Sequence, residues 1–232
     1  MNASTIIKTV AIIPAAGSGI RMGSDRAKQF MELDGRPLLA VTLQPFQDCR
    51  KVDEIILVVP SGDMDYCQKE IVDRFKFHKI KKIVSGGKRR QDSVRFGLEA
   101  VGEHDGLVLI HDGVRPAIDK AFIERVIETA KTHRAVITAL PAKETVKEVN
   151  RRLDVVKTYD RQKVWLVQTP QVFHYKDILA AHQKAALEGW DDATDDSALI
   201  EKMGIPVKVV KGLENNIKVT TSYDLELVRT HL

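Results

Sequence analysis

An apolar strand pattern runs into a glycine-rich loop at residues 11–30, which read AIIPAAGSGIRMGSDRAKQF. The apolar start predicts a strand that is covered on both faces, as in a parallel sheet. Small residues follow it, and glycine lets backbone N–H groups come close to a phosphate or a base edge. In an open α/β sheet, ligands bind beyond the carboxyl ends of the strands. The segment therefore predicts a nucleotide site at one edge of such a sheet.

Further apolar runs follow at regular intervals, and helical patterns separate them. The expected strands cover residues 10–14, 54–60, 82–87, 107–112 and 135–141, and the helices between them cover 64–75, 91–101 and 120–133. This alternation is typical of an α/β fold: a Rossmann-like, mostly parallel sheet sandwiched by helices. Toward the end of the chain we expect helices at 176–187 and 195–203, a strand at 207–212 and a closing helix from about Ser222.

Residues 142–168 break this pattern, because two β-rich stretches flank a polar turn near residues 150–152 and no helix joins them. They predict a protruding β-hairpin arm, a subdomain of what we expect to be a single domain over residues 1–232. An isolated two-stranded ribbon is marginally stable, so we expect the arm to pack against a second copy in a homodimer. The arm then brings residues of one subunit toward the site of the other. We expect Trp165 to lie in the core.

Composition and charge exclude several classes. The 232 residues are 44% hydrophobic and 29% charged, which is ordinary for a globular protein. The sequence has neither an apolar run of about 18 residues nor a signal-peptide pattern, so we expect a cytoplasmic protein with no membrane partner. Cys49 and Cys67 show no metal-site spacing and are interpreted as reduced thiols. A net charge of +4, with few aromatics near the basic stretch 76–90, predicts no nucleic-acid partner.

Two common nucleotide-binding motifs do not fit the first loop. The phosphate loop GxxxxGK[ST] is absent from the sequence. Gly17, Gly19 and Gly23 give GxGxxxG, one residue longer than the dinucleotide fingerprint, and no acidic residue follows at the ribose-binding distance. A tight turn alone would explain the first two glycines but not the neighbouring Arg21 and Lys28.

The motifs PAAGSGIRMG (14–23), KQF (28–30), HDGVRP (111–116), TPQVF (169–173) and NIKVT (216–220) occur in this order along nearly the whole chain. In this order and spacing, the chain resembles the 2-C-methyl-D-erythritol 4-phosphate cytidylyltransferases of the non-mevalonate isoprenoid pathway. The resemblance implies a nucleotidyltransferase-type fold, CTP and a polyol phosphate as substrates, Mg²⁺ as cofactor, and pyrophosphate as product. Ribitol 5-phosphate and other pentitol-phosphate cytidylyltransferases share most of these motifs and remain the alternative. A non-catalytic nucleotide-binding module is a third possibility.

The resemblance also implies residue roles on the nucleotide side. Both reactants are anions, and charge accumulates on the α-phosphorus, so fixed positive charge is the main requirement. Arg21 and Lys28 match the family positions that stabilise this transition state. The residues expected to bind the nucleotide are Pro14, Ala15, Ala16, Gly17, Gly19, Gly86, Gly87, Ser93 and Asp112. We expect Gly86, Gly87 and Ser93 to read the cytosine edge. Asp112 ends a predicted strand, where a carboxylate can hold a ribose hydroxyl or a metal-bound water.

On the acceptor side, Arg161 and Lys218 match family positions that orient the acceptor phosphate for attack, and Thr145 on the arm matches one that contacts it. Arg115 can pair with Asp112 or reach the substrate phosphate.

The acidic string at residues 191–196 is interpreted as a helix start, with Thr194 as N-cap and also in contact with the acceptor. No direct metal ligand is assigned, and neither Arg89 nor Arg90 is given a role.

Overall fold

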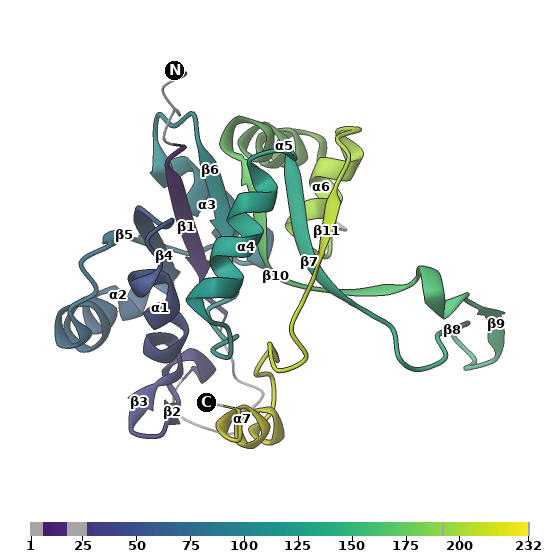
Figure 1. Cartoon of the computed structure of the whole chain (residues 1–232), viewed down its shortest axis with the longest axis horizontal. Helices are drawn as coiled ribbons and strands as arrows, with labels where there is room; N and C mark the ends of the chain where they lie inside the picture. The colour runs from purple at the N-terminus through teal and green to yellow at the C-terminus, as the bar shows by residue number, and fades with distance from the viewer. Residues whose placement is uncertain (1–6, 18–26, 192, 232) are drawn as a thin grey trace.

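A seven-stranded sheet forms the centre of the molecule in the computed structural model, which describes residues 7–17, 27–191 and 193–231 (Figure 1). The strands are β1 (Thr9–Pro14), β4 (Glu54–Val59), β5 (Ile80–Ser85), β6 (Leu107–Ile110), β7 (Ala135–Pro141), β10 (Trp165–His174) and β11 (Lys208–Lys211). Their order in the sheet is β11-β7-β10-β6-β1-β4-β5. All neighbours are parallel except β10, which runs antiparallel to both β6 and β7. The sheet is therefore mixed and mostly parallel.

Helices cover both faces of this sheet. They are α1 (Leu38–Asp48), α3 (Arg90–Val101), α4 (Lys120–Ala130), α5 (Tyr175–Glu188) and α6 (Asp196–Lys202), together with the short α2 (Met64–Tyr66), which continues into the π-helix η4 (Cys67–Asp73). Helix α7 (Ser222–Arg229) packs in a separate cluster with Leu33 and Leu38. Three single turns complete the list: η2 (Lys28–Phe30), η3 (Ser61–Asp63) and η5 (Arg161–Lys163). Along β1, Ala11 and Ile13 pack in the cluster under α1 and α4, whereas Val10 and Ile12 pack in the cluster under α3 and α5. This alternation confirms the predicted fold class.

Two elements differ from the sequence interpretation. Strand β10 leaves the arm and continues into the sheet as far as His174, where the sequence pattern predicted no further strand. Helix α1 was not predicted either; it contains Pro45, and proline normally interrupts a helix. The helix forms nonetheless, since Leu39, Leu43 and Phe46 are fully buried against the sheet. Tertiary packing outweighs the local signal here.

The predicted arm is present. It consists of the ends of β7 and β10 and an antiparallel pair, β8 (Lys147–Val149) with β9 (Val155–Thr158), and it projects from the body of the molecule (Figure 1). A second small pair, β2 (Glu32–Leu33) and β3 (Arg36–Pro37), precedes α1. Trp165 is 41% exposed, so its expected place in the core is wrong: β10 has already left the body there.

No helix in the described ranges combines the length and the apolar composition needed to cross a membrane.

Candidate active site

The carboxyl ends of the parallel strands border a cleft of about 410 Å³. Among its lining residues are most of those predicted to bind the nucleotide, together with two predicted catalytic lysines: Pro14, Ala15, Ala16, Gly17, Gly87, Ser93, Asp112, Lys28 and Lys218. We call it the nucleotide cavity. Two further predicted residues, Gly19 and Arg21, lie outside the residues that the structure describes. Seven of the nine predicted nucleotide residues thus lie together at one edge of the sheet, whereas Gly86 is not among the lining residues.

Three contacts shape the loop that follows β1. The Ala15 N–H donates to the Val58 carbonyl at 2.7 Å, and the buried Gln29 side chain donates to the Gly17 carbonyl at 3.2 Å. A side chain at Gly86 would bring its Cβ within 2.1 Å of the Ala16 Cβ, so only glycine allows this approach. Lys28 begins the turn η2 next to Gln29 and is thereby held at the cavity.

Ser93 closes the loop before α3. Its hydroxyl accepts from the Gly87 N–H at 3.1 Å and donates to the Arg89 carbonyl at 3.2 Å. Ser93 is buried, although it lines the nucleotide cavity. In this structure its hydroxyl therefore shapes the loop whose backbone faces the nucleotide cavity.

A second cavity of about 420 Å³ adjoins the first. Predicted acceptor residues line it, together with polar residues of β10 and α6: Arg115, Thr194, Lys218, Gln168, Thr169, Gln171, Asp195 and Glu201. We call it the acceptor cavity. Arg90, Asp112 and Lys218 line both cavities and form their shared wall. Two ligands bound in these cavities would meet at that wall.

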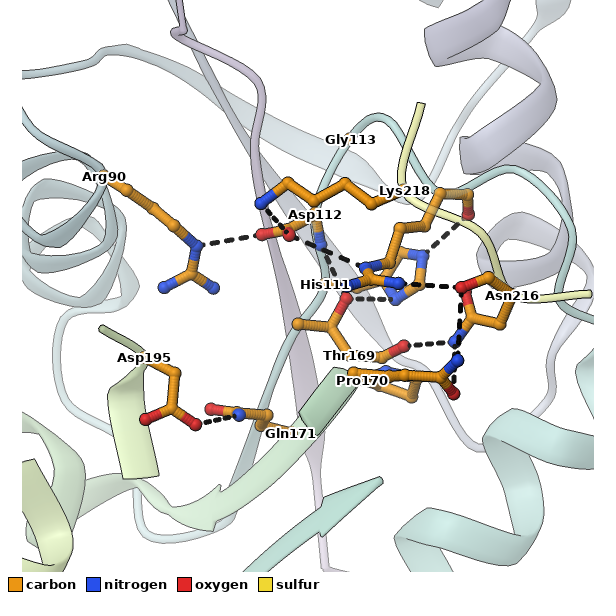
Figure 2. Close-up of polar contacts among 12 residues, drawn as sticks. Arg90, His111, Asp112, Gly113, Thr169, Pro170, Gln171, Asp195, Asn216 and Lys218 are labelled. Carbon is orange, nitrogen blue, oxygen red and sulfur yellow. Dashed lines mark hydrogen bonds and ion pairs between the residues drawn. The ribbon is translucent and has the colours of Figure 1, made fainter. Parts of the chain in front are cut away.

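Asp112 is the centre of the shared wall (Figure 2). Its Oδ1 accepts from the Arg90 Nε at 2.9 Å, and its Oδ2 lies 2.8 Å from the Lys218 Nζ and 3.7 Å from the Arg115 Nε. The side chain is 8% exposed. Burial alone would raise the pKa of Asp112, but the charges of Arg90 and Lys218 outweigh it and hold the pKa well below its usual range. The Asp112 carboxylate is therefore ionised at neutral pH. A cation contacts each of its oxygens: Arg90 at Oδ1 and Lys218 at Oδ2.

The three later sequence motifs meet behind Asp112. The Thr169 hydroxyl accepts from the Asp112 N–H at 3.1 Å and lies 3.1 Å from the His111 Nδ1. Burial lowers the pKa of His111 to about 4, so this imidazole is neutral at pH 7. Asn216 donates to the Thr169 carbonyl at 2.7 Å and its own carbonyl accepts from Arg115 at 2.7 Å (Figure 2). The motifs HDGVRP, TPQVF and NIKVT thus build one rigid support for the shared wall.

The structure does not bring the predicted arm residues to either cavity of the same chain. Arg161 and Thr145 are exposed on the arm, and neither lines the nucleotide or the acceptor cavity. The Arg161 guanidinium donates to the Lys143 carbonyl at 3.0 Å. Any role of these two residues at an acceptor site requires the arm to reach another molecule.

The acidic string before α6 differs from its interpretation. Asp195, not Thr194, is the N-cap: its carboxylate accepts from the Ala198 N–H at 3.1 Å. The Asp195 carboxylate is already oriented by the Gln171 amide, which donates to it at 2.6 Å. Thr194 is left to line the acceptor cavity.

Sequence reasoning missed Arg90, which bridges Asp112 and Asp196 and lines both cavities. The local sequence pattern does not indicate that Arg90 belongs to a site, because its partner Asp196 lies 106 positions further along the chain. The neighbouring Arg89 forms ion pairs with Asp92 and Asp191 at the start of α3.

The described ranges contain no group of three or more His, Cys, Asp or Glu side chains placed to hold a metal ion. Asp112 lines the nucleotide cavity, but Arg90 and Lys218 already occupy its two oxygens. These residues alone do not form a metal site, although phosphate oxygens of a nucleotide are suitable additional ligands for Mg²⁺.

A larger cavity of about 810 Å³ lies elsewhere, around Lys8, Gly106 and Tyr175. Gly106 immediately precedes β6, so this cavity borders the amino ends of the strands. It contains none of the predicted site residues, and ligands of open α/β sheets bind at the opposite edge. We therefore base the functional argument on the two smaller cavities.

Comparisons with known proteins show which family this chain belongs to. Residues 9–232 match the family model described as 2-C-methyl-D-erythritol 4-phosphate cytidylyltransferase. Proteins of that name from Syntrophus aciditrophicus and Geotalea uraniireducens are 47% and 44% identical, and each alignment covers 97% of this chain and 96% or 97% of the relative. The crystal structure of 4-diphosphocytidyl-2C-methyl-D-erythritol synthase from Anaerococcus prevotii superposes with a TM-score of 0.84 at 36% identity, covering 97% of this chain and 98% of that one.

Proposed function

This chain belongs to the 2-C-methyl-D-erythritol 4-phosphate cytidylyltransferase family, and on that premise we propose that it transfers the cytidylyl group of CTP to the phosphate of 2-C-methyl-D-erythritol 4-phosphate. The products are 4-diphosphocytidyl-2-C-methyl-D-erythritol and pyrophosphate. One observation carries the assignment at the level of geometry: two adjoining cavities share a wall built from Arg90, Asp112 and Lys218. A transferase for two anionic substrates needs such an arrangement, whereas a nucleotide-binding module needs only the first cavity.

The chemistry follows from this geometry. An oxygen of the acceptor phosphate attacks the α-phosphorus of CTP, and the bond from that phosphorus to the pyrophosphate oxygen breaks. Negative charge grows on the oxygens around the α-phosphorus and on the leaving group, so fixed cations lower the barrier. Lys28 lines the nucleotide cavity and Lys218 lines both. We assign charge stabilisation to Lys28, with Arg21 in the same role by family resemblance, and orientation of the acceptor phosphate to Lys218.

The acceptor cavity suits a phosphorylated polyol. Arg115 and Lys218 supply positive charge for a phosphate, while Thr194, Gln171 and Asp195 supply oxygen atoms and an amide for hydroxyl groups. Ribitol 5-phosphate carries the same kinds of group, so the lining alone does not separate the two acceptors. The family model and the relatives favour the methylerythritol phosphate.

The first test is product formation. Incubation with CTP, Mg²⁺ and 2-C-methyl-D-erythritol 4-phosphate is expected to release one pyrophosphate for each acceptor consumed. Mass spectrometry should find the acceptor heavier by one cytidylyl group. Tight CTP binding without pyrophosphate release would support a non-catalytic binding module instead.

We propose Mg²⁺ as the cofactor, bound mainly through the phosphates of CTP. When bound there, it supplies positive charge to the phosphate oxygens. The protein contributes the loop after β1 and Lys28, which approach the same cavity. Mg²⁺ usually keeps several waters and takes only one or two protein carboxylates alongside substrate phosphates, so a preformed protein cage is not required.

Removing the divalent cation with EDTA is expected to stop pyrophosphate release while the melting temperature of the ligand-free protein stays unchanged. The reason is that the metal enters with the nucleotide and is not part of the folded structure. Excess Mg²⁺ should restore the full rate. Undiminished turnover in thoroughly chelated protein would contradict the proposal, and so would unfolding of the ligand-free protein by EDTA.

We further propose a homodimer in which the arm of each subunit reaches the acceptor cavity of its partner. The support is that the arm carries exposed apolar side chains, among them Val156 and Leu166, which is 59% exposed. Arg161 and Thr145 lie on the same arm, away from the cavities of their own chain. Docking of the arm on a partner subunit would bury the apolar side chains. It would also bring Arg161 and Thr145 to the acceptor bound in the partner's cavity.

Complementation between two variants tests this arrangement. Arg161→Ala is expected to raise the KM for the acceptor far more than the KM for CTP, and Lys28→Ala to lower turnover by about 10²-fold or more. When both chains are co-expressed, a mixed dimer has one intact site, composed of the Lys28 cavity of one chain and the Arg161 arm of the other. Random pairing in a two-fold dimer then restores about one quarter of the sites. If each arm served its own chain, mixed dimers would show no recovery.

We place the reaction in the cytoplasm. The support is that both cysteines, Cys49 and Cys67, are free and buried, as is usual in a reducing compartment.

A further inference from the structure

Arg90 connects two buried carboxylates that come from distant parts of the chain. It is the first residue of α3, directly after the loop that contains Gly86 and Gly87. Its Nε donates to Asp112 Oδ1 at 2.9 Å, and its Nη1 donates to Asp196 Oδ2 at 2.8 Å. A single planar guanidinium thus joins the loop after β6 to the start of α6, and Figure 2 shows Arg90 and Lys218 both in contact with the Asp112 carboxylate.

The far end of this connection is fixed in the core. Asp196 is only 2% exposed on its side chain, and its second oxygen lies 3.1 Å from the Nε2 of the buried His182 on α5. Burial alone would raise the pKa of Asp196, but the charge of Arg90 leads the effects that keep it lowered. Asp196 is therefore a charged, immobile anchor for the guanidinium.

The other carboxylate that Arg90 contacts, Asp112, lies in the wall between the two cavities. With Asp112 Oδ1 held by Arg90, the carboxylate presents Oδ2 to the Lys218 Nζ at 2.8 Å. Lys218 is 39% exposed, and a lysine side chain has many rotamers, so its ammonium needs such a partner to stay in one place. Arg90 thereby determines where the Lys218 charge stands in the wall between the two cavities.

We propose that Arg90 is a positioning residue of the transfer reaction, holding Asp112, and through it the Lys218 ammonium, at the point where the two substrates meet. The inference rests on the proposed function, because it concerns the same site. A buried ion pair is weak evidence for a stabilising role by itself. The position of Arg90 on both cavities and its single hydrogen bonds to two different carboxylates point instead to orientation of charge.

Arg90→Lys is the main test. Lysine keeps the positive charge, but it lacks the planar guanidinium that bonds to Asp112 with one nitrogen and to Asp196 with another. We expect kcat to fall at least about tenfold, since misplacing a substrate-orienting group has effects of this size or larger. The KM for CTP should change less than kcat: Arg90 is only one of the residues that line the nucleotide cavity, and the loop after β1 and Lys28 remain in place. The variant should remain folded, with a circular dichroism spectrum like that of the parent. Arg95→Lys on the same helix is the matched control, because it makes the same substitution at an arginine that pairs with Glu99 and lines neither cavity.

Asp196→Asn provides a second variant that preserves shape. It lines neither cavity but weakens the anchor of Arg90, so kcat should fall severalfold without a matching rise in either KM. In the double variant with Arg90→Lys, the two losses should combine to less than their product, because both act through one connection.

The outcomes separate the two hypotheses. If the parent protein releases no pyrophosphate, the proposed function fails. If the parent is active and Arg90→Lys retains kcat within about twofold at a temperature where it is folded, only the positioning role is overturned. A lowered melting temperature with unchanged kcat would assign Arg90 to stability alone.

Discussion

Lys28→Ala is expected to lower the turnover number by about 10²-fold or more, by analogy with removal of one donor from a site that stabilises developing negative charge. Lys28 lines the nucleotide cavity and begins the turn η2, whose next residues, Gln29 and Phe30, are buried. The turn therefore keeps the backbone of Lys28 at the edge of the cavity that we assign to CTP. Loss of this cation should leave the fold intact, because the buried neighbours stay in place.

The control is Lys69→Ala, which removes an exposed lysine from η4 that lines neither cavity. Both variants should be compared by steady-state pyrophosphate release at saturating CTP and acceptor. Normal turnover by folded Lys28→Ala would refute the assigned role.

The second large effect is expected for Lys218→Ala, where kcat/KM for the acceptor should fall by about 10²- to 10³-fold. Positioning of a nucleophile contributes several kcal/mol to catalysis, and Lys218 stands on the wall shared by both cavities. The substitution also leaves Asp112 with one fewer cation, so a carboxylate charge faces the incoming phosphate. Repulsion of the acceptor adds to the loss of orientation.

Initial rates with the acceptor varied at fixed CTP measure this effect. The matched control is Lys208→Ala on β11, an exposed lysine that lines neither cavity. An unchanged kcat/KM for the acceptor in a folded Lys218→Ala protein would remove Lys218 from the mechanism. An equal loss for CTP and acceptor would make it a general electrostatic group instead.

The sequence predicted the parts of the fold whose signal is local. Strands such as β1 and β7 are continuous apolar runs bounded by loop residues, so their positions follow from the pattern. Strand β10 was only partly predicted, because its first half belongs to the arm and its second half enters the sheet. Where a strand pairs is decided by long-range contacts, which a local pattern does not contain.

The site residues likewise divide into those with a local sequence signal and those placed by long-range contacts. The loop after β1 and the residues Asp112 and Lys218 were expected in one site, and they line one cavity, because the carboxyl ends of parallel strands meet at one edge of the sheet. Arg90 was not assigned, since its two partners are 22 and 106 positions away in sequence. The N-cap of α6 was misplaced by one residue, because Thr194 and Asp195 are both good N-caps and the local pattern does not show the long-range contact of Asp195 with Gln171.

The most direct measurement of the central claim compares two acceptors. Purified protein with CTP and Mg²⁺ is offered 2-C-methyl-D-erythritol 4-phosphate in one reaction and ribitol 5-phosphate in another, and pyrophosphate release is followed. Cytidylyl transfer to the first predicts rapid release there and little with the second. Release with ribitol 5-phosphate alone, or with neither acceptor, would contradict the account.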